Sequence, residues 1–381
     1  ANLIYVALKL LEYERKQEAD KAAQFLVIEE PEAHIHTHIQ KTLFESHTIN
    51  KTQVFLSTHS AHISSVAKIS EVNILGLNEN IVEVFQPSNN LNSTECSRIE
   101  RYLNATRSTL LFAKGVMLVE GEAELILIPA LVKKVLGLSL DELGISLISM
   151  DSAFFEHISN LFHPDRIRKN CAIITDLDVS IEPLPDDEAD DNNYQNLCRN
   201  SQKSGVIRKG KLDEHTKDND YISAFYANHT FEVDFVGADN SIEIKEVLPS
   251  IYQQKASIDK SIGLLEDSEV RIYGKEILRL ADKVGKGWLS LLTSEKVTSQ
   301  THIPSYILDA IAFSCGYKLA PKILYKMCCY RLSNPMPVLE DEDKPIQFFT
   351  DNNLNIDSCI DEFEKQCPDD DLSYLIRLLD R

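Results

Sequence analysis

Two pairs of acidic residues stand directly after apolar segments of the chain. Glu120 follows the apolar run of residues 116–119, and Glu124 comes one helical turn later. Asp176 and Asp178 follow a second apolar run, in the segment IITDLD. Residues two apart in an extended chain project to the same side, and parallel α/β folds place ligands at the carboxyl edge of the sheet. These four carboxylates are therefore expected to converge in one cleft.

Carboxylates brought together in this way favour a divalent cation, because unpaired they would repel and raise each other's pKa. Ligands that are all oxygen favour Mg²⁺ or Mn²⁺ over Zn²⁺. Two such ions about 4 Å apart can activate a water and stabilise the leaving oxygen in phosphodiester cleavage. A lone E-x-x-x-E usually lies on a solvated helix face, and a lone D-x-D usually forms a turn. Both together, each at the end of an apolar strand, favour the metal site.

Two further segments offer partners for this chemistry. Lys286 stands between Gly285 and Gly287. Glycines let the backbone and a ligand approach closely, so Lys286 is the candidate cation for the transition state. The segment HTFEVDF offers a fifth acid, for which we favour Glu232, with Thr230 expected on the same face.

A similar combination occurs near the start of the chain. The segment FLVIEE is a short apolar run that ends in Glu29 and Glu30, and FLSTHS is a second apolar run that ends in a polar turn with His59. In P-loop ATPases a carboxylate at such a strand end holds Mg²⁺, and the next residue can orient the attacking water. From the neighbouring strand, His59 could reach the terminal phosphate of a nucleotide. Together, in this order and spacing, the two segments indicate part of an ATPase.

The elements that must position these residues alternate between helix and strand. Strands that alternate with helices of this length predict an α/β fold with a parallel sheet and right-handed crossovers. A long polar insertion is expected at about 180–220, and helices beyond Lys286. In the first part we predict helices at 1–18 and 33–46 and buried strands at 24–28 and 53–57, with further strands at 72–77 and 81–85. In the second part we predict strands at 116–120, 145–150 and 171–176 and a helix at 122–136 closed by Gly137. After the polar insertion, this α/β part is expected to continue at 230–235.

The composition is that of an ordinary globular chain. Its 381 residues predict about two to three domains, and 43% hydrophobic and 26% charged residues exclude disorder as the main state. No apolar run reaches the ~18 residues of a membrane helix, and no secretory leader is expected. Eight cysteines without a C-x-x-C pair favour reduced thiols and a cytoplasmic protein. Because the chain starts with Ala1 inside an expected helix, we expect it to be the trailing part of a longer polypeptide.

The net charge of −20 does not favour nucleic-acid binding, because phosphate contacts need Lys and Arg. A local basic segment can serve, however, and residues 199–211 carry five bases and no acid. Such runs are usually solvated loops, and contact with DNA is the alternative interpretation. Residues 339–371 form an acidic tail with twelve acids and two lysines.

Two further patterns do not indicate a functional site. The segment GVIRKGKL at 205–212 fits G-x-x-x-x-G-K but lacks the Ser or Thr that would bind Mg²⁺. It also lies downstream of FLVIEE, the wrong order for a phosphate loop. His34, His36 and His38 alternate, and residues two apart on a helix point away from each other. We interpret them as packed or capping histidines.

The segments EEPEAHIH and STHS resemble the Walker B and switch-histidine motifs of ABC-type ATPases of the SMC, RecF and OLD (overcoming lysogenization defect) group. The resemblance implies that Glu29 is the Mg²⁺ carboxylate, Glu30 the catalytic base and His59 the switch histidine. Two positions depart from the pattern: Glu29, where Asp is more usual, and Thr37, where Pro is frequent. The chain has no Walker A loop upstream, so ATP with Mg²⁺ is expected only in the full-length protein.

The segments LVEGEAE and ITDLD resemble the glutamate and D-x-D motifs of the Toprim domain of topoisomerases, primases and OLD nucleases. HTFEVDF and GKGW are similar to two further motifs of the OLD nucleases. The resemblance implies a catalytic Lys286, a role for Glu120 as general base, and a set of metal ligands for two Mg²⁺ or Mn²⁺ ions. That set is Glu120, Glu124, Asp176, Asp178 and Glu232.

An ATPase half, a Toprim domain and a helical tail follow each other in the OLD family, which includes the nuclease subunit of the Gabija anti-phage system. We therefore predict the C-terminal portion of an ABC-type ATPase at 1–95, a Toprim nuclease at 96–290 and a helical, acidic region at 291–381. The function implied is a metal-dependent DNA endonuclease under ATPase control, in anti-phage defence or DNA processing. DNA, a homo-oligomer formed through the ATPase and Toprim regions, and a helicase-like companion subunit are the candidate partners, and no membrane is expected.

Two other functions stay open. The first is an SMC/RecF-like DNA-binding or sensing ATPase whose Toprim does not cleave, although the full set of acids argues against it. The second is a topoisomerase or primase. A topoisomerase needs a tyrosine nucleophile, and no tyrosine stands out in such a setting.

Overall fold

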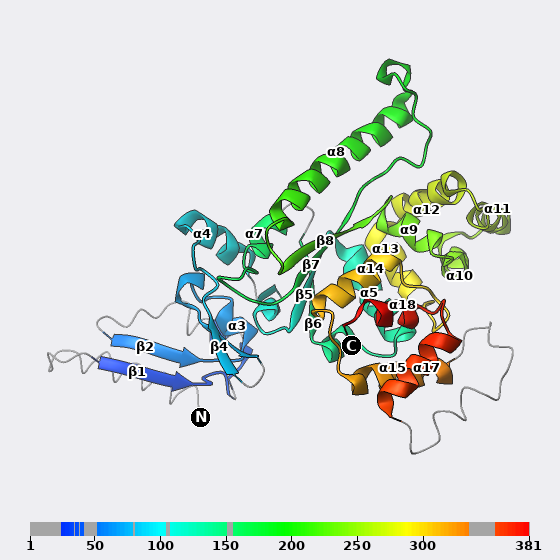
Figure 1. The fold of residues 1–381 in the computed structure, drawn as a ribbon. Helices are drawn as coiled ribbons and strands as arrows, with labels where there is room; N and C mark the ends of the chain where they lie inside the picture. The colour runs from blue at the N-terminus through cyan, green and yellow to red at the C-terminus, as the bar shows by residue number, and fades with distance from the viewer. Residues whose placement is uncertain are drawn as a thin grey trace. The chain divides into compact units, whose positions relative to one another are not determined.

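The computed structural model divides into two compact units, Ala1–Ala113 with His157–Arg168, and Lys114–Glu156 with Lys169–Arg381 (Figure 1). We describe each unit by itself. The helix predicted at 1–18 and most of the helix predicted at 33–46 lie outside the described residues. The structure describes residues 24–33, 35–37, 39–41, 52–78, 81–103, 107–150, 155–334 and 355–380.

In the first unit, β1 (Gln24–Glu29) and β2 (Thr52–Ser57) pair in parallel, with Glu29 opposite Ser57. This confirms the two predicted strands. The prediction that they are buried is wrong: Phe25 is 59% exposed and Val27 75% exposed. Among the described residues these two strands pair only with each other, so they form no wider sheet that could bury them there.

The remainder of the first unit has a small core of its own, which includes Ile63, Ile69 and Leu110. The predicted strands at 72–77 and 81–85 form an antiparallel hairpin. Asn92 caps the helix α4, because its side chain accepts hydrogen bonds from the amides of Thr94 and Glu95. The elements are α3 (Ala61–Ser64), η1 (Ile69–Glu71), β3 (Ile74–Asn78), β4 (Ile81–Phe85), α4 (Ser93–Tyr102) and η2 (Arg107–Leu111).

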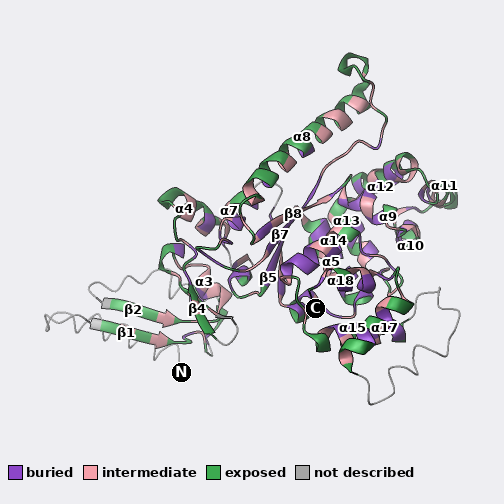
Figure 2. Cartoon of the chain, in the orientation of Figure 1, coloured by how far each residue is buried: buried purple, intermediate pink, exposed green. Residues whose placement is uncertain are grey.

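The second unit is built on a four-stranded sheet whose paired strands are all parallel, in the order β6-β5-β7-β8. These strands are β5 (Gly115–Val119), β6 (Ile145–Ser149), β7 (Cys171–Asp176) and β8 (Ile222–Ala227). Every residue of the two central strands, β5 and β7, is buried (Figure 2). The α/β class, the parallel sheet and the first three strands are therefore confirmed, whereas β8 was not predicted.

Helices enclose this sheet and complete one hydrophobic core. Met117 on β5, Leu131 on α5, Ile311 on α14 and Leu375 on α18 are all fully buried in it. The prediction of helices beyond Lys286 is confirmed. The helices are α5 (Glu122–Val135), α6 (Leu140–Leu143), α9 (Phe231–Gly237), α10 (Ser241–Ile251), α11 (Lys255–Leu265), α12 (Val270–Val284), α13 (Lys286–Ser294), α14 (Ser305–Ser314), α15 (Pro321–Ser333), α17 (Ile356–Gln366) and α18 (Asp371–Leu378). The boundary between the two units falls within α7 (Phe155–Ser159).

Part of the predicted acidic tail is folded into this unit. Arg331 on α15 is buried and its guanidinium pairs with Asp370, with the closest nitrogen and oxygen 2.5 Å apart. The same guanidinium donates to the carbonyl oxygen of Val135. A buried arginine with these partners fixes the segment before α18 to the core. Residues 335–354, which begin the acidic stretch, lie outside the described residues.

The polar insertion contains a helix that the interpretation as solvated loops did not foresee. After η3 (Glu188–Asp190), α8 (Asn193–Thr216) runs for 24 residues. It begins at Asn192, whose side chain accepts from the amides of Tyr194 and Gln195. Only Gly205 and Leu212 of α8 are buried, and most of the helix is exposed in Figure 2. The segment GVIRKGKL lies inside this helix, so it forms no phosphate loop.

The segment HTFEVDF is also helical. Thr230 caps α9 by accepting a hydrogen bond from the amide of Val233, and Glu232 lies in the first turn. The expectation that Thr230 and Glu232 share a face is wrong, because residues two apart on a helix point in different directions. No helix among the described residues is both long and apolar enough to cross a membrane.

Candidate functional site

The ends of β5 and β7 bring Glu120 and Asp176 together. Glu120 follows β5 directly and Asp176 is the last residue of β7, and these strands are neighbours in the sheet. One carboxylate oxygen of Glu120 accepts from the amide of Asp176 at 3.2 Å and from the hydroxyl of Thr175. The convergence expected for these two acids is therefore seen in the structure.

Glu124 and Glu232 lie close enough to Glu120 and Asp176 for their charges to raise the pKa of Asp176. Each is in the first turn of its helix, α5 or α9, and they are only 5% and 6% exposed. Burial raises the pKa of Glu124 from 4.5 to about 7, and the charges of Glu232 and Glu120 add to the rise. Burial also raises the pKa of Asp176 well above its ordinary value, and the charges of Glu120, Glu124 and Glu232 act in the same direction. We call Glu120, Glu124, Asp176 and Glu232 the carboxylate cluster.

Asp178 meets the cluster through an arginine that the sequence analysis did not single out. The Arg208 guanidinium donates to Asp178 Oδ2 at 2.9 Å and to the carbonyl oxygen of Asp176 at 2.5 Å. Its Nε lies 3.5 Å from Glu120 Oε1. Arg208 thus bridges two predicted metal ligands, Glu120 and Asp178. The basic run 199–211 was the available signal, but it does not show which base turns inward.

A glycine on α8 allows this contact. A Cβ atom on Gly205 would lie only 2.0 Å from the carbonyl oxygen of Leu177, so the helix backbone runs against the loop between Asp176 and Asp178. Arg208 stands three residues further along α8 and reaches the same loop. In that loop Asp178 has a φ of 53°, a conformation that Asp adopts more easily than most residues.

Lys286 approaches the cluster from the start of α13. Gly285, with a φ of 92°, directs the chain into this helix. The Lys286 ammonium lies 3.3 Å from Glu232 Oε2. Although burial opposes its charge, the carboxylates of Glu232, Asp176 and Glu124 raise the pKa of Lys286 above its ordinary value. The lysine therefore stays protonated at neutral pH, as the predicted role requires.

The predicted ligands are all carboxylates, which suits a hard divalent cation such as Mg²⁺. Several of them pair with Arg208 or Lys286 in the structure. No three His, Cys, Asp or Glu side chains of the described ranges stand in the arrangement of a metal site. Arg208 pairs with Glu120 and Asp178, and Lys286 pairs with Glu232. Glu124 and Asp176 are buried, and both burial and the charges of the neighbouring carboxylates raise their pKa values. Carboxylate oxygens are the ligands that Mg²⁺ and Mn²⁺ prefer.

Tyr306 on α14 is a second residue that the sequence analysis missed. Its hydroxyl is buried and has no hydrogen-bond partner in the part of the chain that the structure describes. Burial raises the pKa of Tyr306 well above its ordinary value, and the charges of Asp176, Glu124 and Glu232 contribute. A polar group beside the cluster without a protein partner is consistent with a site completed by a ligand. No sequence signal marked this tyrosine.

The predicted ATPase residues lie at the ends of β1 and β2. Glu29 ends β1, and the amide of Glu30 donates to the carbonyl oxygen of Ser57 at 3.0 Å. His59 Nε2 is 3.9 Å from Glu30 Oε1, and both side chains are exposed. The structure therefore brings Glu30 and His59 together across the strand pair, while Glu29 stays exposed at the strand end.

Glu32, which the sequence analysis did not select, connects these two segments. Its Oε1 accepts from the hydroxyl of Thr58 at 2.7 Å and from the amide of His59 at 2.8 Å. Glu32 is therefore a positioning residue for the turn that carries His59. Of the three alternating histidines, His36 is exposed, and His34 and His38 lie outside the described residues.

Comparisons with known proteins match the same two regions. A family model described as "Overcoming lysogenization defect protein-like, TOPRIM domain" matches residues 111–178, and an AAA ATPase domain model matches residues 1–64. Comparison with the curated proteins finds no significant match.

Among solved structures, the C-terminal region of the Burkholderia pseudomallei OLD protein is 26% identical. The match covers 53% of this chain and 97% of that one, with a TM-score of 0.40. The C-terminal region of the Xanthomonas campestris pv. campestris OLD protein is 21% identical, with 58% and 99% covered and a TM-score of 0.38. The two family models, an ATPase domain followed by an OLD-like Toprim domain, support an OLD-family ATPase–Toprim protein.

Proposed function

We propose that this chain carries a metal-dependent DNA endonuclease centre in its Toprim domain, under the control of its ATPase domain. The observation that carries the proposal is the contact of Glu120 with Asp176 beside the buried Glu124 and Glu232. Four carboxylates held this closely need a cation to be ionised together at neutral pH. Phosphodiester hydrolysis is one of the reactions that a metal-loaded cluster of this kind supports in nucleic-acid enzymes.

The predicted site residues would have three roles: metal binding, acceptance of a proton and stabilisation of the transition state. Glu120, Glu124, Asp176, Asp178 and Glu232 would hold Mg²⁺ or Mn²⁺, up to two ions. When bound, these ions supply an activated water and stabilise the leaving oxygen. Glu120 would accept the proton of the attacking water. Lys286, kept protonated by Glu232, would donate to an oxygen of the phosphate and oppose the charge that develops in the transition state.

The ATPase residues would serve ATP hydrolysis rather than cleavage of the phosphodiester. In the full-length protein Glu29 would hold the Mg²⁺ of ATP and Glu30 would orient the attacking water. His59 would contact the terminal phosphate, in the position that Glu32 fixes. We infer a homo-oligomer formed through the ATPase and Toprim regions, a helicase-like companion subunit as a candidate partner, and a role in anti-phage defence or DNA processing.

One observation favours the alternative of a DNA-binding or sensing ATPase with a Toprim that does not cleave. Arg208 and Lys286 already neutralise part of the carboxylate charge. In a non-cleaving module these ion pairs would be permanent. In a nuclease, Arg208 must release Glu120 and Asp178 when the cations bind.

A plasmid assay separates the two functions. Supercoiled plasmid is incubated with the chain in Mg²⁺ or Mn²⁺, with Asp176→Asn and with EDTA as controls. A nuclease produces nicked or linear DNA that is absent in both controls. Intact plasmid in every lane, with correctly folded protein, would support the non-cleaving module instead.

A further inference from the structure

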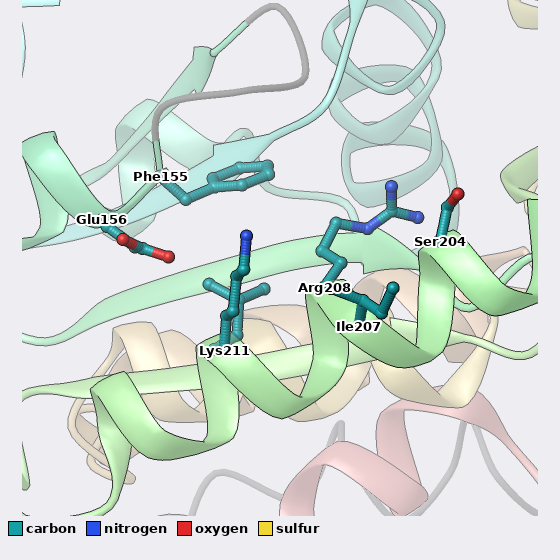
Figure 3. A pocket seen from close by; sticks show the side chains of 7 residues that line it. Phe155, Glu156, Ser204, Ile207, Arg208 and Lys211 are labelled. Atoms are coloured by element: carbon teal, nitrogen blue, oxygen red, sulfur yellow. The ribbon is translucent and has the colours of Figure 1, made fainter.

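A cavity of about 280 Å³ lies beside the carboxylate cluster, on the side where α8 passes it. Arg208 and Lys211 stand on successive turns of α8, and both line this cavity. Figure 3 shows their side chains rising into the same space, with Phe155 and Glu156 facing them (Figure 3). Arg208 also lies 3.5 Å from Glu120 of the carboxylate cluster, so one side chain borders both the cavity and the cluster.

The two cations differ from the other bases of α8. Arg199, Lys203 and Lys209 each pair with an acid, at 2.6, 2.6 and 2.5 Å. Lys211 is exposed and forms no ion pair with any residue that the structure describes. Arg208 is paired only with the acids that a divalent cation would take over. This cavity therefore presents one unpaired positive charge and a second that the binding of a metal would release.

The walls of the cavity suit a phosphate attached to an organic group. Ser204 adds a hydroxyl next to the two cations, and Phe155 and Ile207 add apolar surface. Glu156 is the only acid that lines the cavity within the described residues, so two positive charges face one negative charge. Arginine and lysine side chains are the residues that contact nucleic-acid phosphates most often.

We propose that this cavity binds a backbone phosphate of the DNA strand that enters the carboxylate cluster, with Lys211 and Arg208 as its cations. The inference, which rests on the function proposed above, names α8 as the element that positions the strand. A phosphate in the cavity would give Arg208 a new partner when it leaves Glu120 and Asp178. Entry of the strand and release of the carboxylates are thereby coupled.

Binding is measured in EDTA, where no cleavage occurs, by the fluorescence anisotropy of a labelled single-stranded oligonucleotide. Lys211→Gln is expected to weaken binding about five- to tenfold and to reduce the salt slope by about 1, as for the loss of one phosphate contact. Glu156→Gln, which removes the opposing charge, is expected to tighten binding. Lys209→Gln is the matched control: it removes the same charge two residues away, where Lys209 pairs with Asp213 and lies over the Tyr226 ring. Its effect is expected to stay below twofold.

Equal losses in the Lys211 and Lys209 variants would overturn the assignment, because both would then reflect net charge alone. No detectable binding by the unmodified chain would also overturn it. A Lys211→Gln variant that binds inorganic phosphate less well but DNA equally well would show a site for small anions instead. The plasmid assay in Mn²⁺ is separate. If the plasmid is cleaved and Lys211→Gln binds DNA as well as the unmodified chain, the phosphate site is rejected and the nuclease is retained. If Lys211→Gln weakens DNA binding but the plasmid stays intact, the phosphate site is retained and the nuclease is rejected.

Discussion

The Arg208 guanidinium lies 2.9 Å from Asp178, in a chain where Asp178 is a predicted metal ligand. The same side chain is 3.5 Å from Glu120. A helix from the polar insertion thus supplies a cation to the acids that follow β5 and β7. Since divalent cations bind the same oxygens, Arg208 and the metal are expected to compete.

Replacing Arg208 tests this competition. Arg208→Met leaves Glu120 and Asp178 without their partner, and an unpaired, largely buried charge costs about 1–3 kcal/mol. We expect a lower melting temperature in EDTA and tighter binding of Mn²⁺ in a calorimetric titration. Lys209→Met, on the same helix but paired with Asp213, should change neither. Unchanged stability together with unchanged Mn²⁺ affinity would refute the competition.

A matched pair of glycines tests the position of α8. Gly205→Ala would place a Cβ atom 2.0 Å from the carbonyl oxygen of Leu177, so the helix must shift. Forced repacking of this kind costs about 1–3 kcal/mol. Gly210→Ala meets nothing within 4 Å and is expected to stabilise the same helix by about 0.5–1 kcal/mol. Urea unfolding of both variants measures the difference, and a Gly205→Ala protein as stable as Gly210→Ala would contradict the close contact.

The raised pKa of Glu124 predicts a pH dependence. Its pKa is about 7 in the folded protein against an ordinary 4.5, so between these values the folded state binds more protons than the unfolded state. The contribution of Glu124 to the stability of the metal-free protein therefore falls as pH rises through this window. Above pH 7 the loss is about 3 kcal/mol, from about 1.4 kcal/mol per pKa unit. Urea unfolding at several pH values in EDTA should show it.

Glu124→Gln cannot ionise, and it serves as the control for this effect. Its stability should change less with pH than that of the unmodified chain between about pH 5 and pH 8. Binding of Mn²⁺ should show the opposite trend in the unmodified chain, and tighten as pH rises through 7, because a metal binds the ionised carboxylate. Parallel stability curves for the two proteins would argue against the raised pKa.

The sheet and its acids were predictable because strand ends are local signals. Apolar runs followed directly by Glu120 and by Asp176 predict both the strands and the edge at which the carboxylates meet. The same logic predicted that Glu30 and His59 follow neighbouring strands, which are β1 and β2. In each case the chemistry-bearing residue is adjacent in sequence to the element that positions it.

The missed features depend on contacts that are distant in sequence. Arg208 and Asp178 are 30 residues apart, and the basic run does not reveal which side chain turns inward. α8 itself was interpreted as loop, since its polar surface hides the buried Gly205 and Leu212. The HTFEVDF segment has the alternation of a strand, yet Thr230 starts a helix by capping Val233. Capping is decided locally, and it outweighs that alternation here.

The central claim is that the acids after β5 and β7 form a divalent metal centre. The most direct measurement is the number of Mn²⁺ ions bound per chain, from the electron paramagnetic resonance signal of free Mn²⁺ at about pH 8. We predict up to two ions in the unmodified chain, and binding at least tenfold weaker in Asp176→Asn, with Lys209→Gln unchanged. Equal binding by Asp176→Asn, or no binding by the folded chain, would contradict the account.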